Sequence, residues 1–212
     1  MTRQQSLLFF VLASVFVLTR FIDPYPLSWF VKILPLLLLI GVTFKHAKTK
    51  AERFFLIGLI CSALGDFLLD YDRINWFIFG LGAFLFAHVF YLLSFKPISL
   101  TLLKKRVIYL FIYSIYGLVM FTMIASSLGT LFIPVLIYMS VLLLMGITSL
   151  ISEKSNKWLI IGGLSFIISD SILGVNKFYY SVENAHVYIM ISYYFAQYAL
   201  VKGIFAKKDH SI

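Results

Sequence analysis

The feature that most constrains this chain is a series of long apolar runs that contain few charged residues. A helix needs about 20 consecutive apolar residues to cross the hydrocarbon core of a bilayer. The runs are continuous instead of alternating, which predicts helices, because a helix satisfies its own backbone polar groups within lipid. The chain is therefore predicted to be an all-α, polytopic membrane protein, an eight-transmembrane-helix bundle with helices at 5–22, 27–44, 54–70, 74–95, 106–125, 131–151, 157–175 and 186–205.

The overall composition excludes an ordinary soluble domain. Of the 212 residues, 61% are hydrophobic and 13% are charged, whereas soluble domains average about 45–50% and about 25%. The polar segments between the runs are short, so residues 1–212 are predicted to form a single integral membrane domain. No small-x-small cleavage motif follows the first run, which is therefore expected to be a retained helix and not a signal peptide.

In the eight-helix prediction, most of the basic residues lie on one side of the membrane and few lie on the other. Lysines and arginines mark cytoplasmic loops, so a multi-pass protein of the cell membrane with both termini in the cytoplasm is predicted. The net charge of +9 is explained by this signal and by anionic lipid, with no nucleic-acid partner. The predicted cytoplasmic group is Arg3, Lys45, Lys48, Lys50, Arg53, Lys96, Lys104, Lys105, Arg106, Lys154, Lys157, Lys202, Lys207 and Lys208, and the opposite group is Arg20, Arg73 and Lys177.

Two short segments suggest an internal repeat. The segment GDFLL at 65–69 resembles SDSIL at 169–173, four predicted helices later. Four is an even number of crossings, so the repeat would be a parallel 4+4 arrangement and not an inverted one. A chance likeness between two short apolar segments is the competing explanation.

Three ionisable residues lie inside the apolar runs at similar predicted depths. Such groups cost about 2.5–3.5 kcal/mol each on insertion scales and mark functional sites by default. At about 1.5 Å per residue, Lys32, Asp66 and Asp170 lie about 6–7 Å below the outer surface. They predict one polar pocket that opens toward the outer leaflet, and the alternative is a buried ion pair that only fixes helix packing.

Other polar residues are weaker candidates for the same pocket. Asp70, one turn after Asp66, is interpreted as an interfacial cap, although it could instead widen the mouth of the pocket. His88 lies about 21 Å deep, and a core histidine is the competing interpretation of its stripe with Tyr91. The same doubt applies to Tyr194 and Gln197, whereas Asn176 either lines the mouth or ends its helix. The only cysteine is Cys61, and no zinc-type ligand pattern is present, so no metal is predicted.

An ordered set of motifs from about residue 30 to residue 200 resembles the YhhN-like membrane proteins, whose animal relatives are the lysoplasmalogenases. Each motif is short and apolar, but their order along the chain is specific. They are KILP at 32–35, LGDFLL at 64–69, FGLGAFLFAHVFY at 79–91, PVLIYM at 134–139, GGLSFIISDSIL at 162–173 and YYFAQ at 193–197.

The resemblance implies a membrane hydrolase that cleaves the vinyl ether bond of lysoplasmalogens, a lysophospholipid-type substrate, without a cofactor. The products would be a fatty aldehyde and glycerophosphoethanolamine or glycerophosphocholine. Vinyl ether cleavage needs a carboxylic acid and a carboxylate, a division of labour that glycosidases also use. We expect Asp66 and Asp170 to be this catalytic pair, with substrate-binding or supporting roles for Lys32, His88, Tyr91, Tyr194, Gln197 and Asn176. The alternative is a transporter or lipid-binding membrane protein that uses the Lys32/Asp66/Asp170 pocket.

Overall fold

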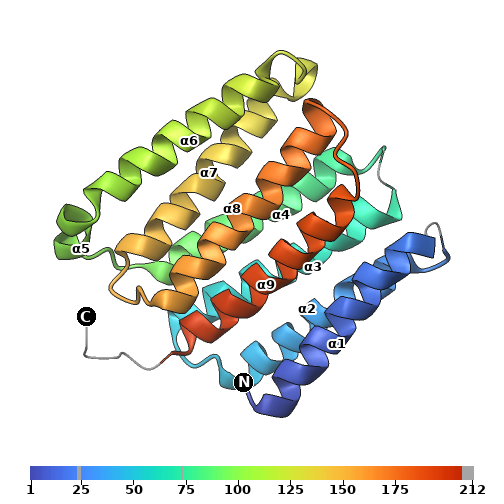
Figure 1. The fold of residues 1–212 in the computed structure, drawn as a ribbon. Helices are drawn as coiled ribbons and strands as arrows, with labels where there is room; N and C mark the ends of the chain where they lie inside the picture. The colour runs from blue at the N-terminus through green and yellow to red at the C-terminus, as the bar shows by residue number, and fades with distance from the viewer. Residues whose placement is uncertain (23–24, 73, 207–212) are drawn as a thin grey trace. The chain divides into compact units, whose positions relative to one another are not determined.

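The computed structural model describes residues 1–22, 25–72 and 74–206, with Arg20 described by its backbone alone. The described residues are helical, apart from turns and one isolated antiparallel bridge between Ile98 and Ser152, which confirms the all-α class. Arg73, Lys207 and Lys208 of the charge pattern lie outside the described residues. The helices, labelled in Figure 1, are α1 (Arg3–Thr19), α2 (Ser28–His46), α3 (Lys50–Tyr71), α4 (Phe77–Phe95), α5 (Leu100–Lys105), α6 (Val107–Ala125), α7 (Phe132–Ile151), α8 (Lys157–Phe178) and α9 (Ala185–Ile204), with 3-10 turns η1 (Arg20–Ile22) and η2 (Gly129–Leu131).

Several of these helices are long and apolar enough to cross a membrane, which confirms a multi-pass membrane protein. Among the described residues six qualify: α2, α3, α4, α6, α7 with its preceding turn, and α8. Helix α1 is apolar but has only 17 residues, and α9 is not among the six. Each of the eight predicted ranges contains a helix, but the count of eight membrane spans is not confirmed.

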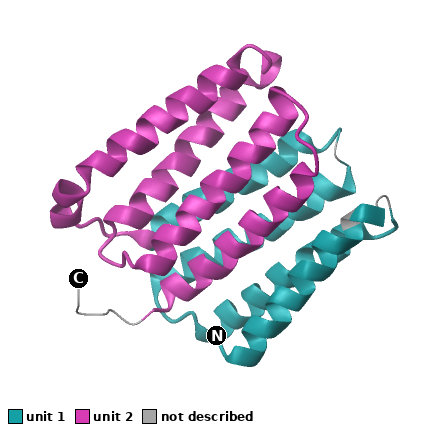
Figure 2. Cartoon of the chain, viewed as in Figure 1, with its two compact units in different colours: residues 1–94 teal, residues 95–212 magenta. Residues whose placement is uncertain are grey.

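The chain divides into two compact units, coloured separately in Figure 2. Unit 1 covers Met1–Ser94 and unit 2 covers Phe95–Ile212. The boundary between the units therefore lies at the end of the fourth predicted helix, before the fifth begins. The proposed 4+4 repeat requires a boundary at this place, but the repeat itself stays a prediction.

In unit 1, small residues on α3 allow α4 to pack closely against it. A Cβ atom added to Gly58 would lie 2.6 Å from ring carbons of Tyr91, and one added to Gly65 would lie 2.6 Å from the ring of Phe84. Between these glycines, the Ser62 and Tyr91 hydroxyl oxygens are 3.1 Å apart and hydrogen bonded. Small residues serve the same purpose in other membrane helix pairs, where they let two backbones approach.

In unit 2, α7 and α8 approach each other in the same manner. A Cβ atom added to Gly163 would lie 2.8 Å from Ser149 Oγ and 3.4 Å from Gly146 Cα. This contact leaves no space for a larger side chain and so fixes the register between the two helices. The register determines which residues of α7 can reach the polar residues of α8.

Candidate functional site

Lys32 and Asp66 form an ion pair inside unit 1. Lys32 lies one turn after the start of α2, and Asp66 lies about one turn before the end of α3. The Lys32 Nζ and Asp66 Oδ1 atoms are 3.2 Å apart, and the side chains are 10% and 2% exposed. Two unlike charges at this distance compensate part of the large free energy needed to bury each one. The structure thus brings together the first two of the three residues predicted to share a pocket.

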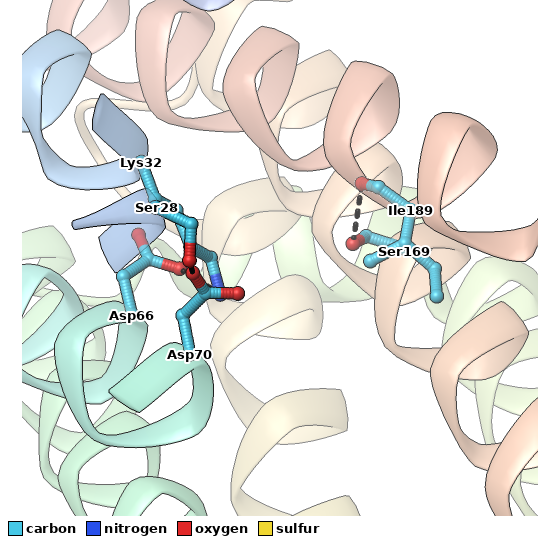
Figure 3. A network of polar contacts seen from close by, with 6 residues as sticks. All are labelled: Ser28, Lys32, Asp66, Asp70, Ser169 and Ile189. Carbon is cyan, nitrogen blue, oxygen red and sulfur yellow. Dashed lines mark hydrogen bonds and ion pairs between the residues drawn. The ribbon is translucent and has the colours of Figure 1, made fainter. Parts of the chain in front are cut away.

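A second polar contact lies one helical turn away, between Ser28 and Asp70 (Figure 3). Ser28 Oγ donates a hydrogen bond of 2.5 Å to Asp70 Oδ2. Ser28 precedes Lys32 by four residues and Asp70 follows Asp66 by four, so the two contacts connect the same faces of α2 and α3. This matched spacing is the sequence signal that could have placed Ser28 beside Asp70.

Asp72, and not Asp70, organises the turn between α3 and α4. The Asp72 carboxylate accepts hydrogen bonds from the backbone N–H groups of Ile74 and Asn75 and from the Asn75 side chain. The hydrogen bonds from Asn75 lower the pKa of Asp72 below the usual value of an aspartate. Asp70 is therefore better described by its contact with α2 than by the interfacial cap predicted from sequence.

An aromatic cluster made of Trp29, Phe67, Tyr71 and Trp76 lies beside these polar contacts. Trp29 directly follows Ser28, and Phe67 directly follows Asp66. Neighbouring ring centroids are 5.1 Å apart for Trp29 and Phe67, and 4.9 Å apart for Tyr71 and Trp76. Tryptophan and tyrosine are enriched where a membrane protein meets the headgroups, which agrees with a location of this end of α3 near the membrane surface.

In unit 2, Asp170 is held by a tyrosine from the preceding long helix. Tyr138 Oη of α7 donates a hydrogen bond of 2.5 Å to Asp170 Oδ2 of α8. Tyr138 is buried, with 6% of its surface exposed, and Asp170 is half-buried. Sequence reasoning did not assign a role to Tyr138. That Asp170 shares one pocket with Lys32 and Asp66 stays a prediction.

The residues on either side of Asp170 contact two further helices. Ser169 Oγ donates to the Ile189 carbonyl oxygen of α9 at 3.0 Å, as Figure 3 shows. Tyr116 Oη of α6 donates to Ser171 Oγ at 2.7 Å. Three consecutive residues of α8 therefore form hydrogen bonds with α9, α7 and α6.

The remaining predicted site residues lie mostly in the interior. His88 and Tyr91 of α4 are fully buried, with ring centroids 6.5 Å apart. Tyr194 and Gln197 of α9 are 2% and 0% exposed. Asn176 Oδ1 accepts a hydrogen bond of 2.9 Å from Val182 N, which ties the end of α8 to the segment before α9. Substrate-binding roles for these residues stay predictions.

A bound metal ion needs several ligand side chains close together. In that part, no group of three or more histidine, cysteine, aspartate or glutamate side chains could hold a metal ion. Cys61 is half-buried in α3 and is a free thiol.

These observations define a class: a multi-pass helical membrane protein with ionisable side chains held inside its apolar segments. The model of the YhhN family matches residues 27–204, and the chain belongs to this family. It is 30% identical over 178 residues to a lysoplasmalogenase of Mycobacterium bovis, an alignment that covers 81% of this chain and 68% of the relative. It is 31% identical over 194 residues to human lysoplasmalogenase TMEM86B, covering 89% and 81%. Human lysoplasmalogenase TMEM86A is 30% identical over 189 residues, covering 82% and 77%. No solved structure matches the chain at a significant level.

Proposed function

We propose that this protein is a membrane-embedded hydrolase that cleaves the vinyl ether bond of lysoplasmalogens. The products are a fatty aldehyde and glycerophosphoethanolamine or glycerophosphocholine. The observation that carries the proposal is the similarity, over most of the chain, to several proteins named lysoplasmalogenase. The carboxyl groups of the buried Asp66 and the half-buried Asp170 support it, because this reaction needs an acid and a carboxylate in an apolar setting where the lipid chain can bind.

The reaction consumes one water molecule. A carboxylic acid gives its proton to the vinyl carbon farther from the ether oxygen, and the π electrons of the double bond form the new C–H bond. The other vinyl carbon becomes an oxocarbenium ion, to which water adds while a carboxylate accepts one of its protons. The hemiacetal hydroxyl group then loses its proton and forms the carbonyl group, while the bond between this carbon and the glycerol oxygen breaks. The glycerol oxygen takes up a proton, and the aldehyde is released.

Asp66 and Asp170 are the two carboxyl groups that we assign to these steps, one as the acid and one as the carboxylate. Lys32 supports the assignment of Asp66, since its ammonium group lies 3.2 Å away and balances a negative charge there. The hydrogen bond from Tyr138 supports the assignment of Asp170, since it holds the carboxyl group in one orientation. His88, Tyr91, Tyr194, Gln197 and Asn176 are proposed to support the site or contact the substrate.

The proposal includes eight membrane spans with both termini in the cytoplasm. Helices α1 and α9 would supply the two spans beyond the six that qualify by hydropathy. It also includes a parallel 4+4 repeat. In that repeat, Lys32 of α2 and Tyr138 of α7 occupy comparable places, because each contacts an aspartate on the next long helix of its own unit. Fourteen of the 18 basic residues on one side support the orientation.

The test is to purify the protein in lipid nanodiscs and supply two lysophospholipids with the same chain length and head group, one vinyl ether and one acyl ester. The expected result is aldehyde release from the vinyl ether alone, at a rate proportional to the amount of protein. A protein treated with heat before the assay is the control. Binding of the lipid without aldehyde release would refute the proposal and favour the lipid-binding alternative.

A further inference from the structure

The contact between Tyr138 and Asp170 joins two helices whose register is fixed elsewhere. In the α7–α8 pair, a Cβ atom added to Gly163 would lie 3.4 Å from Gly146 Cα, so the two helices approach closely there. Tyr138 lies eight residues before Gly146 and Asp170 seven residues after Gly163, which corresponds to about 12 Å and about 10 Å along the two antiparallel helices. The glycine contact therefore brings the phenol and the carboxyl group to the same level and holds them there.

The hydroxyl group of Tyr138 is buried together with its ring. A buried hydroxyl group without a hydrogen-bond partner is unfavourable by roughly 1–3 kcal/mol, and hydrogen bonds that involve a charged partner are shorter and stronger than neutral ones. Tyr138 Oη and Asp170 Oδ2 are 2.5 Å apart, within hydrogen-bonding distance. The phenol therefore constrains both the position and the rotation of the Asp170 carboxyl group.

We propose that Tyr138 is a positioning residue for Asp170 in the reaction assigned above, an inference that rests on the proposed function. By donating to Oδ2, the phenol directs any proton that Asp170 carries, or accepts from water, to Oδ1. If Asp170 is the acid, its Oδ1–H bond breaks as the new C–H bond forms on the substrate. If Asp170 is the carboxylate, an O–H bond of water breaks as the new Oδ1–H bond forms. Tyr138 is unchanged in both cases. Tyr138 itself does not touch the reacting atoms.

A merely structural contact between α7 and α8 is the competing explanation, and the chain offers a matched control for it. Tyr116 also donates a phenolic hydrogen bond to α8, at the adjacent residue Ser171, with an oxygen-to-oxygen distance of 2.7 Å. Tyr116→Phe and Tyr138→Phe each delete one hydroxyl group and one helix-to-helix hydrogen bond. They differ in whether the lost partner is the Asp170 carboxyl group, and also in burial, since Tyr116 is 38% and Tyr138 6% exposed; the parallel stability measurement accounts for the second difference.

The experiment measures kcat and KM for aldehyde release by the native protein, Tyr138→Phe, Tyr116→Phe and Asp170→Asn, together with the combination of Tyr138→Phe and Asp170→Asn. The thermal stability of each protein in detergent is recorded in parallel. We expect Tyr138→Phe to lower kcat about 10- to 100-fold with little change in KM, because one hydrogen bond to the Asp170 carboxyl group is lost. Tyr116→Phe should retain native kcat, and Tyr138→Phe should have no further effect once Asp170 is asparagine.

A spectroscopic readout separates positioning from folding. Infrared difference spectra of protein with ¹³C-labelled aspartate should show a carboxyl band that shifts in Tyr138→Phe but not in Tyr116→Phe. Native kcat in a folded Tyr138→Phe protein, or equal losses in both phenylalanine variants, would overturn the role of Tyr138 but leave the proposed function in place. Absence of aldehyde release by the native protein would instead overturn the proposed function and this role with it.

Discussion

The Lys32 Nζ atom of α2 lies 3.2 Å from the Asp66 Oδ1 atom of α3, and both side chains are largely buried. This ion pair connects the two helices of unit 1 that also share the Ser28–Asp70 hydrogen bond. A buried pair of this kind is sensitive to the loss of either partner, because the remaining charge loses its compensation.

Replacing Lys32 with methionine is therefore expected to destabilise the protein. The side chain keeps most of its length, but Asp66 loses its ammonium counterion, and the free energy of unfolding should fall by about 3–5 kcal/mol. Titration with sodium dodecyl sulfate in mixed micelles measures this change. The combination of Lys32→Met with Asp66→Asn should recover part of the loss, and a double variant no more stable than Lys32→Met would contradict the pairing.

Close packing of α3 against α4 gives a second expectation. Gly58→Ala should lower the free energy of unfolding by about 1–3 kcal/mol, because the new methyl group overlaps the ring of the buried Tyr91. Gly82→Ala is the matched control, since nothing lies within 4 Å of the added atom. The same micelle titration compares the two variants, and equal effects would show that α3 and α4 pack less closely than described.

The orientation in the membrane is testable by reporter fusions. A reporter enzyme that works only in the cytoplasm should be active when it is fused within residues 96–106, and also when it is fused after the last residue. The physical reason is the concentration of basic residues in these segments. Opposite locations for the two reporters would remove the eight-span arrangement.

How much of this structure the sequence could predict depends on the kind of signal. Helix α3 begins at Lys50 and not at residue 54 as predicted. Thr49 and Glu52 form a capping box, which makes the polar residues before 54 the first turn of the helix. Hydropathy does not detect such a turn. The short helix α5 was missed for the same reason, since it carries Lys104 and Lys105 in only six residues.

The candidate site divides in a similar way. The sequence could place Lys32 at the depth of the two aspartates, because charged residues in apolar runs are few and their depths follow from the helix rise. It could not say that Asp66 is the aspartate that Lys32 contacts. Tyr138 could not be paired with Asp170, because a tyrosine in an apolar run is unremarkable by composition. Its contact depends on the register that Gly146 and Gly163 set between α7 and α8, and that register is a property of packing.

The chemical step predicts the fate of the transferred proton. A reaction in D₂O should release an aldehyde with one deuterium on the carbon next to the carbonyl group, because an exchangeable carboxyl proton is delivered to that carbon. Immediate reduction to the alcohol and mass spectrometry measure the label. Aldehyde added to the protein in D₂O controls for later exchange, and an unlabelled product would contradict protonation at carbon.

The central claim is that Asp66 and Asp170 together carry vinyl ether hydrolysis, and aldehyde release by their asparagine variants tests it most directly. In folded, membrane-inserted protein, Asp66→Asn and Asp170→Asn should each lower kcat by about 10²–10⁴-fold. The double variant should be little worse than the worse single one, because residues that act as a unit are not additive. Treatment with EDTA should leave the native rate unchanged. Native activity in either single variant, or activity that EDTA removes and zinc restores, would contradict the account.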